Sequence, residues 1–161
     1  MDPRQRIVGV GEYAVSHLEE EKLITYSLGS CIGLSLYDPT TKLGGLLHAM
    51  LPLSNINPEK ALANPAMFVD TGVLLLFKAL YEQGAVKGRL VVKAAGCGNP
   101  MGQNEVFKIG ERNYTVLKKL LWKNNILLEA EDVGGSASRT IHFEVSTGQI
   151  LLRSNGTKRH L

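Results

Sequence analysis

Hydrophobic and polar residues alternate with a period of two over much of the chain, which is typical of β-strands that bury one face. Two longer segments instead carry apolar residues three and four positions apart, the spacing of an amphipathic helix. The strands predicted in this way cover residues 7–16, 22–28, 32–38, 42–51, 89–95, 126–133, 140–145 and 150–153. The predicted helices cover residues 66–83 and 111–125.

Turn-forming residues separate these segments. Residues 38–41, Asp-Pro-Thr-Thr, follow the third strand, where proline fixes φ and aspartate bonds the backbone that follows it. Gly84 follows the first helix, and glycine often stands just after a helix. Residues 53–65 are polar, with asparagine and proline at intervals, which predicts a long loop.

The order of these elements predicts an α+β fold of layered sheets, β-sandwich-like, covered by two helices. A chain of 161 residues that is 44% hydrophobic is long enough for one compact core. We therefore expect a single domain over residues 1–161. Its core is expected at about 7–153, followed by a basic C-terminal tail at 154–161.

Charge and hydropathy argue against two classes of partner. The net charge is only +3, and the basic residues are scattered until the tail, so no clustered face favours nucleic acid. The longest apolar run, residues 73–77, is too short to cross a bilayer, and the first residues do not resemble a secretory signal. We expect a cytoplasmic protein without membrane insertion and without a nucleic-acid partner.

The two cysteines, Cys31 and Cys97, lie in glycine-rich surroundings. A reducing compartment argues against pairing them in a structural disulfide. The chain has no CxxC motif and only four scattered histidines, so no metal site is expected. Cys97 is interpreted as a small packing residue, and a thiol redox sensor built on both cysteines is one alternative.

Cys31 and His48 are candidates for a hydrolytic site. A thiol nucleophile needs an exposed turn, a nearby base and backbone N–H groups for the oxyanion. Cys31 follows Gly29 and Ser30 before a strand, and glycine permits unusual φ values and close approach of a substrate. His48 lies in an apolar strand, so it is either a buried histidine satisfied by backbone or a residue that points into a site.

Thr25 is the third candidate. On strand alternation it shares a face with Leu23 and Ser27. Its hydroxyl would be able to orient an imidazole, the third role in a catalytic triad. A β-branched threonine in a strand also needs no functional explanation.

The order Thr25, Cys31, His48, together with the motifs around them, resembles the CheD family of chemoreceptor glutamine deamidases. The matching stretches are residues 27–31, 36–39, 44–52, 64–66, 70–72, 109–113 and 131–135, followed by Arg139. They run from about Val8 to Leu152.

This resemblance implies that Cys31 is the nucleophile, that His48 is the general base and acid, and that Thr25 orients His48. It implies that the substrate is a glutamine side chain on the cytoplasmic helices of a chemoreceptor, converted to glutamate with release of ammonia. It also implies a CheC-type phosphatase as a partner and a fold related to the catalytic domain of cytotoxic necrotising factor toxins.

The chemistry of such a site suggests a thiolate of Cys31 stabilised by His48 as imidazolium. Backbone N–H groups around Ser30 and Cys31 would hold the oxyanion, with Gly29 and Ser27 also assigned to oxyanion or substrate binding. The route passes through a thioester and requires no metal or organic cofactor. It would also accept a glutamyl methyl ester, which predicts a methylesterase side activity.

An alternative from another class is a regulatory binding module that docks on a receptor or on a CheC-type phosphatase with little turnover. The sequence also departs from the family at residues 96–101, Gly-Cys-Gly-Asn-Pro-Met, where relatives usually read Gly-Gly-Ala followed shortly by Met. In the family this stretch lies near the active site, so the departure bears on substrate fit.

Overall fold

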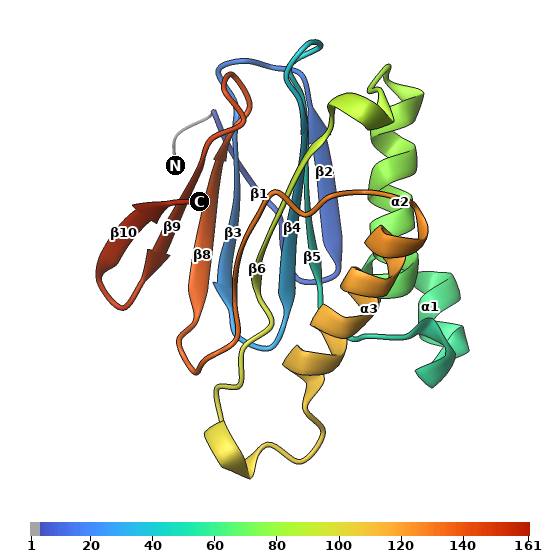
Figure 1. Cartoon of the computed structure of the whole chain (residues 1–161), viewed down its shortest axis with the longest axis vertical. Coiled ribbons are helices and arrows are strands. Elements are labelled where there is room, and N and C mark those ends of the chain that lie inside the picture. Colours follow the sequence, from blue (N-terminus) through green and yellow to red (C-terminus); the bar gives the residue numbers. More distant parts are fainter. Residues whose placement is uncertain (1–3) are drawn as a thin grey trace.

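The protein is built of three layers, two β-sheets and a layer of helices (Figure 1). The computed structural model describes residues 4–161, apart from the side chain of Gln103, so residues 1–3 of the expected domain lie outside the described residues. The outer sheet has the strand order β1 (Gln5–Ile7), β3 (Lys22–Leu28), β8 (Arg139–Glu144), β9 (Ile150–Ser154) and β10 (Thr157–His160). The central sheet has the order β2 (Glu12–Ser16), β5 (Leu43–Ala49), β4 (Ile32–Asp38), β6 (Val91–Gly96) and β7 (Ala130–Val133).

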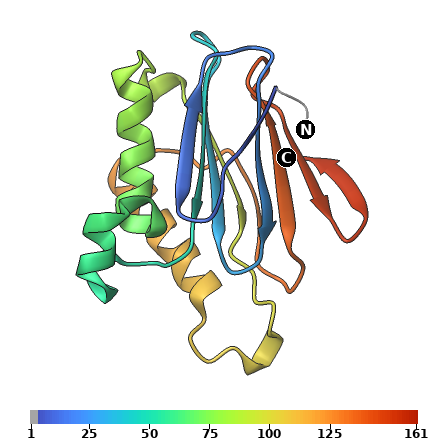
Figure 2. The same ribbon diagram turned by 180° about the vertical axis from the view of Figure 1, so that it is seen from behind.

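The two long helices, α2 (Val69–Glu82) and α3 (Ile109–Lys123), cover the face of the central sheet that is turned away from the outer sheet (Figure 2). A short helix, α1 (Pro58–Ala63), precedes them. Single 3-10 turns cover Ser54–Ile56, Pro65–Met67, Lys87–Arg89 and Gly102–Asn104. The α+β layering expected from the sequence is confirmed, and no helix among residues 4–161 is long and apolar enough to cross a membrane.

The central sheet is buried on both faces because it lies between the outer sheet and the helices. All seven residues of β4 and all seven of β5 are buried. Alternate side chains of these strands enter two separate clusters. The cluster against the helices includes Leu34, Leu36, Leu47, Val73, Leu76 and Leu117. The cluster between the sheets includes Leu23, Leu28, Leu46, Ala95, Ile141 and Phe143.

The predicted strand at 7–16 is wrong, because it is two strands in different sheets. β1 pairs in parallel with β3 of the outer sheet, whereas β2 pairs with β5 of the central sheet. The chain crosses between the sheets at residues 8–11, where Gly11 has a φ of 72° that favours glycine. The alternation continues across this crossing, so the hydrophobic pattern alone does not reveal it.

Two other segments also differ from their predictions. The predicted loop at 53–65 contains α1, whose first turn is capped by the Asn57 side chain. The predicted tail at 154–161 contains β10, which pairs with β9. Neither α1 nor β10 has a buried residue, so neither leaves an apolar pattern in the sequence. β3 and β4 have the predicted bounds, and the other elements differ from prediction mainly at their ends.

A buried carboxylate anchors the far end of β4. Asp38 is 0% exposed and accepts hydrogen bonds from Arg89 Nη2 at 2.8 Å, from Val86 N at 3.0 Å and from Thr40 N at 3.0 Å. The Arg89 guanidinium, and after it the backbone N–H groups, lower the pKa of Asp38 to about 2 against the opposing effect of burial.

We expect Asp38→Ala to lower the free energy of unfolding by about 3 kcal/mol at neutral pH, because it leaves Arg89 and several N–H groups without their acceptor. Glu19→Ala is the matched control, since Glu19 forms an exposed ion pair with Lys42 at 3.0 Å. Because the pKa of Asp38 is lowered in the folded state, its contribution is present above pH 4 or so and is lost as the pH falls towards 2. Urea titrations of both variants check this, and equal effects would contradict it.

Candidate active site

Five segments meet at one end of the sandwich, the lower end in Figure 1. They are the crossing at residues 8–11, the β3–β4 turn, the ends of β5 and β6, and the start of α3. Because β4 and β5 are antiparallel, the start of one lies beside the end of the other, with Ile32 opposite Ala49. This arrangement brings the region of Cys31 next to the region of His48.

The register of β4 and β5 sets the relation between Cys31 and His48. Gly33 pairs with His48, and Cys31 precedes Gly33 by two positions, so the two candidates are diagonal neighbours. Cys31 packs against the cluster between the two sheets and is partly exposed. His48 is directed into the same space, since it contacts Thr25 of the outer sheet.

Thr25 forms a buried hydrogen-bond chain with His48. Thr25 Oγ1 lies 2.7 Å from His48 Nδ1 and 2.6 Å from the carbonyl oxygen of Val8. A carbonyl oxygen can only accept, so the single hydroxyl proton of Thr25 is donated to Val8. Thr25 therefore accepts from His48, which requires the proton of the neutral imidazole to reside on Nδ1.

The opposite ring nitrogen, His48 Nε2, is consequently the atom with the free lone pair. It is buried and has no hydrogen-bond partner within the described part of the chain. A buried acceptor without a partner is unfavourable, and such atoms often mark a catalytic role. The alternative of a histidine satisfied only by backbone is wrong, because Thr25 holds one nitrogen and the other is unpaired.

Burial disfavours the charged forms of both Cys31 and His48. It lowers the pKa of His48 to about 4, and it raises the pKa of Cys31 against a smaller opposing effect of the residue's own backbone N–H. The resting pair at neutral pH is therefore a thiol and a neutral imidazole. These directions contradict the thiolate and imidazolium pair expected from the sequence.

The backbones of Cys97 and Cys31 are neighbours, but their side chains point in different directions. The Cys97 N–H donates to the Cys31 carbonyl at 2.8 Å. Cys97 has a φ of 51° and packs in the cluster against the helices, whereas Cys31 packs between the sheets. The thiols lie on opposite faces of the central sheet, so a disulfide would require the backbone to rearrange. Burial also raises the pKa of Cys97 to about 12, which argues against a redox sensor.

The remaining predicted residues lie close to Cys31 but differ in their surroundings. Ser27 does not share the buried face with Thr25, because a bulge with a φ of 56° leaves it exposed. Gly29 has no left-handed φ, so its position does not require glycine for backbone reasons. Its carbonyl accepts from Gly98 N at 2.8 Å. Ser30 is half-buried, and its carbonyl accepts from the Asn113 side chain at 2.9 Å.

Comparison with known proteins places this chain in a family. The sequence model described as CheD chemotactic sensory transduction matches residues 50–154. A probable chemoreceptor glutamine deamidase CheD of Solibacter usitatus is 48% identical, over 98% of this chain and 93% of the relative. Relatives with the same description from Syntrophus aciditrophicus and Pyrococcus abyssi are 44% and 47% identical, over 93% of this chain and 94% and 91% of the relatives.

The chain belongs to the CheD family. The matched region of the family model begins at residue 50, beyond Thr25, Cys31 and His48. The alignment with the Solibacter relative, in contrast, covers nearly the whole chain. Family membership therefore rests on similarity along nearly the whole sequence and not only on the three candidate residues.

The glycine-rich stretch in which this chain differs from the CheD pattern is bonded directly to the turn of Cys31. A Cβ at Gly96, whose φ is 103°, would collide with the Cys31 carbonyl oxygen. Arg139 is buried and donates to the Gly96 carbonyl at 3.2 Å and to Asp132 Oδ1 at 3.1 Å. Cys97, in the same stretch, is a non-glycine residue with a left-handed φ.

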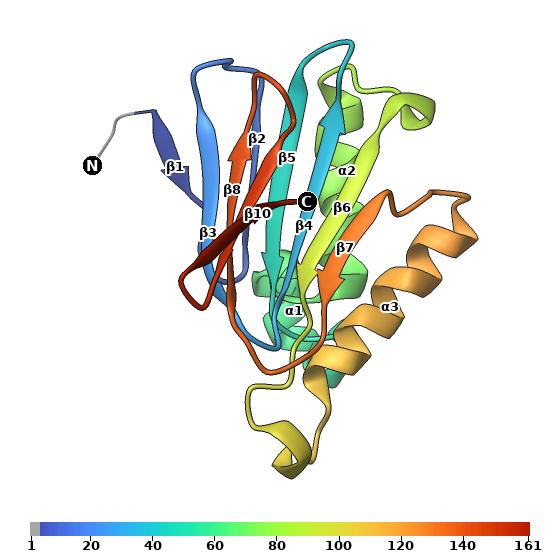
Figure 3. The ribbon, with the colours of Figure 1, turned by 60° about the vertical axis from the view of Figure 1, so that its left-hand side comes forward.

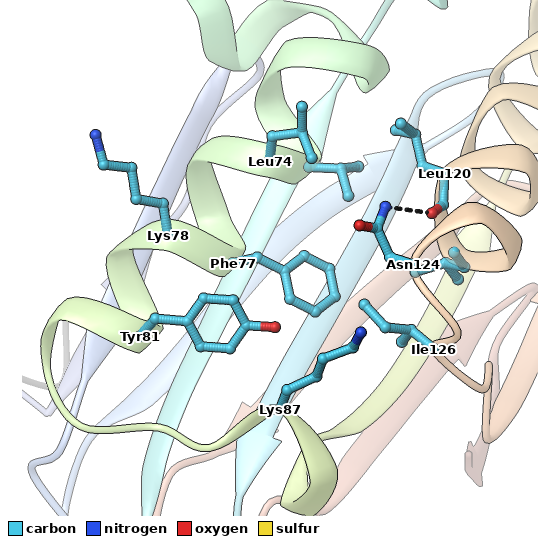
Figure 4. Close-up of a pocket in the computed structure, with 10 residues that line it drawn as sticks. Leu74, Phe77, Lys78, Tyr81, Lys87, Leu120, Asn124 and Ile126 are labelled. Atoms are coloured by element: carbon cyan, nitrogen blue, oxygen red, sulfur yellow. Dashed lines mark hydrogen bonds between the residues drawn. The ribbon is translucent and has the colours of Figure 1, made fainter.

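Two cavities beside α3 lie outside the candidate site of Cys31 and His48. One of about 280 Å³ lies between the C-terminal halves of α2 and α3, and Figure 4 shows Phe77, Tyr81 and Lys87 around it. The other, of about 390 Å³, lies beside the start of α3 and is lined by residues that include Leu53 and Phe107. Neither is lined by a cysteine or histidine, and among the described residues no group of acidic residues, histidines and cysteines is placed to hold a metal ion.

We expect Gly96→Ala to reduce stability by about 1–3 kcal/mol and to displace the Cys31 turn, because φ and the Cys31 carbonyl both oppose a side chain there. Gly29→Ala is the matched control. A Cβ at Gly29 would meet only Pro100 Cγ at 3.6 Å, an ordinary contact, so stability should stay within about 0.5 kcal/mol of wild type. Thermal unfolding measures both, and tolerance of alanine at Gly96 would contradict this description of the turn.

Proposed function

We propose that the protein is a hydrolase that deamidates glutamine side chains of chemoreceptors, with Cys31 as nucleophile and His48 as general base and acid. The observation that carries the proposal is the Val8–Thr25–His48 hydrogen-bond chain, which leaves Nε2 as a buried acceptor on the face of Cys31. The names of the similar CheD proteins from Solibacter and Syntrophus support the same activity.

In the first half of the reaction, the Cys31 sulfur attacks the side-chain carbonyl carbon of glutamine while its proton moves to His48 Nε2. Because the resting thiol is neutral, the proton is transferred as the carbon–sulfur bond forms, and no preformed thiolate is needed. We assign the oxyanion to backbone N–H groups at Ser30 and Cys31. Thr25 keeps the ring oriented by accepting from Nδ1 in both protonation states of the ring.

In the second half, the imidazolium of His48 donates its Nε2 proton to the departing nitrogen, and ammonia leaves. Burial makes this imidazolium a stronger acid than a free one, which favours the otherwise difficult loss of an amine. Neutral His48 then accepts a proton from water as that water attacks the thioester. The thiolate of Cys31 leaves and regains a proton from His48, and glutamate is released.

Access to the site is consistent with a protein substrate. The segment after β6 runs beside Gly29 and exposes Met101, Val106 and Phe107. The cavity of about 390 Å³ at the start of α3 adds Leu53 to this apolar surface and includes Arg112 among its lining residues. We propose that receptor helices approach along this surface, in the cytoplasm.

Three finer points belong to the same proposal. A glutamyl methyl ester should react by the same thioester route, because methoxide leaves more easily than ammonia. A CheC-type phosphatase is the second expected partner. Residues 1–161 form one deamidase domain whose sandwich is related to the cytotoxic necrotising factor catalytic domain, a relation that superposition of the two folds tests.

The second candidate function is a regulatory docking module with little turnover. Exposed Val106 and Phe107 favour it, because they are 82% and 70% exposed on the segment that leads to α3. Docking alone does not account for the unpaired His48 Nε2. The two functions therefore differ in whether glutamine is converted to glutamate.

Variants of the three candidate residues separate these functions. Cys31→Ala should abolish deamidation, His48→Asn should reduce it about a thousandfold, and Thr25→Val should reduce it by about tenfold to a hundredfold, since orientation contributes less than proton transfer. The measurement is mass spectrometry of a receptor cytoplasmic fragment, in which each deamidation adds about one dalton at a glutamine.

Ser35→Ala is the matched control for Thr25→Val. Ser35 is also buried in a strand, and its hydroxyl also donates to a backbone carbonyl, that of Lys93 at 3.4 Å. Removal of the Ser35 hydroxyl should leave turnover within a factor of about two of wild type. Turnover by Cys31→Ala at the wild-type rate would eliminate the mechanism, and receptor binding without any deamidation by the wild type would favour the docking module.

A further inference from the structure

The start of α3 contacts the β3–β4 turn, the residue that follows β5 and the segment that follows β6. Its Asn113 is 0% exposed and is directed towards the central sheet. The two N–H groups of its side-chain amide donate to two carbonyls, that of Ser30 at 2.9 Å and that of Met50 at 3.0 Å. Ser30 directly precedes Cys31, and Met50 follows His48 by two positions.

One turn earlier, Gly110 makes a second contact of the same kind. A Cβ at this position would collide with the carbonyl oxygen of Gly98 and lie 2.7 Å from the carbonyl carbon of Cys97. Gly98 in turn donates to the Gly29 carbonyl at 2.8 Å. The face of α3 that carries Gly110 and Asn113, three residues apart, therefore lies against the residues just before β4, just after β5 and just after β6. Figure 3 shows the start of α3 near this end of the central sheet.

A neutral amide matches the two hydrogen-bond acceptors at this position. Both acceptors are carbonyl oxygens, so the group between them must offer two hydrogens and no negative charge. The Asn113 Oδ1 atom is buried without a hydrogen-bond partner in the described structure. An apolar side chain would fill the space between helix and sheet without this unpaired acceptor, so packing alone does not explain the asparagine.

We propose that Asn113 is a positioning residue that fixes the Cys31 turn relative to the end of the His48 strand. This inference rests on the proposed function of Cys31 and His48. The amide connects the backbone on either side of the reacting pair, so its loss lets the turn move relative to β5 without removing either reacting group. Misplacement of reacting atoms by about 1 Å is enough to lower turnover a hundredfold.

Asn113→Asp tests the proposal because it preserves the shape and removes both donors. We expect kcat on a receptor fragment to fall about a hundredfold with KM within about threefold of wild type. Between two carbonyl oxygens the buried aspartate has a raised pKa, and its neutral form regains one O–H donor. The ratio of variant to wild-type kcat should therefore rise as the pH falls from about 8 to about 5.

Asn124→Asp is the matched control on the same helix. Its side-chain amide donates to the Leu120 carbonyl at 2.8 Å (Figure 4). This bond lies at the exposed C-terminal end of α3, opposite the end that contacts the Cys31 turn. The control variant should leave kcat and its pH dependence unchanged. Asn113→Ser, which keeps one donor and adds no charge, is the second variant and should give an intermediate kcat. If Asn113→Asp behaves as Asn124→Asp does, or if both Asn113 variants unfold, the inference is overturned.

A readout independent of turnover separates this inference from the proposed function. The factor by which His48→Asn slows alkylation of Cys31 by iodoacetamide measures how well the two side chains are aligned. In a protein that already carries Asn113→Asp, we expect His48→Asn to slow the alkylation of Cys31 by a factor close to one. A wild type that deamidates no receptor glutamine, but shows this loss of coupling, would refute the proposed function and leave the positioning role intact. Unchanged coupling would refute the positioning role.

Discussion

The candidate site depends on a hydrogen-bond chain that runs from His48 through Thr25 to Val8. The last acceptor in this chain is a backbone carbonyl, that of Val8. Because the terminal acceptor cannot donate, every proton in the chain has a defined position, and the lone pair is left on His48 Nε2. The three groups come from β5 of the central sheet, β3 of the outer sheet and the crossing between the sheets, so the hydrogen-bond chain exists only when the sandwich is closed. The crossing at residues 8–11 thus has a chemical consequence, since it brings the Val8 carbonyl to Thr25.

Burial determines how this site would operate. The layers that enclose His48 and partly enclose Cys31 disfavour charge on both, so the reacting pair begins neutral. In the proposed mechanism, such a pair would exchange a proton during attack on the glutamine and return it to the leaving group. The imidazolium formed in this environment would be a stronger acid than a free one, which suits the release of ammonia better than it suits a stable ion pair.

The sequence predicts the layered α+β fold and the order of the candidate residues because these depend on local pattern. α2 buries one face and β4 is buried on both faces, and each leaves an apolar signal in the sequence. The crossing near Gly11, the short α1 and the exposed β10 leave no such signal, because their positions depend on pairing with distant segments. The neutral state of Cys31 and His48 also depends on tertiary burial, which a sequence pattern does not contain.

The role of Asn113 shows a second kind of contact that a sequence pattern does not predict. It lies in the stretch at 109–113 by which the chain resembles the CheD family, yet helical spacing alone describes it as a polar residue of an amphipathic helix. Its partners, the carbonyls of Ser30 and Met50, are 83 and 63 residues away in sequence. Backbone acceptors carry no side-chain identity, so no residue pattern indicates such a contact before the fold is known.

The central claim is that His48 is held as the neutral tautomer with its proton on Nδ1. Nitrogen-15 NMR of histidine-labelled protein, with the His48 signals assigned by their loss in His48→Asn, tests this most directly. The account predicts a protonated Nδ1 and an unprotonated Nε2 at pH 7, and a ring that gains its second proton only near a pH of about 4. A ring with its proton on Nε2, or one already doubly protonated at pH 7, would contradict it.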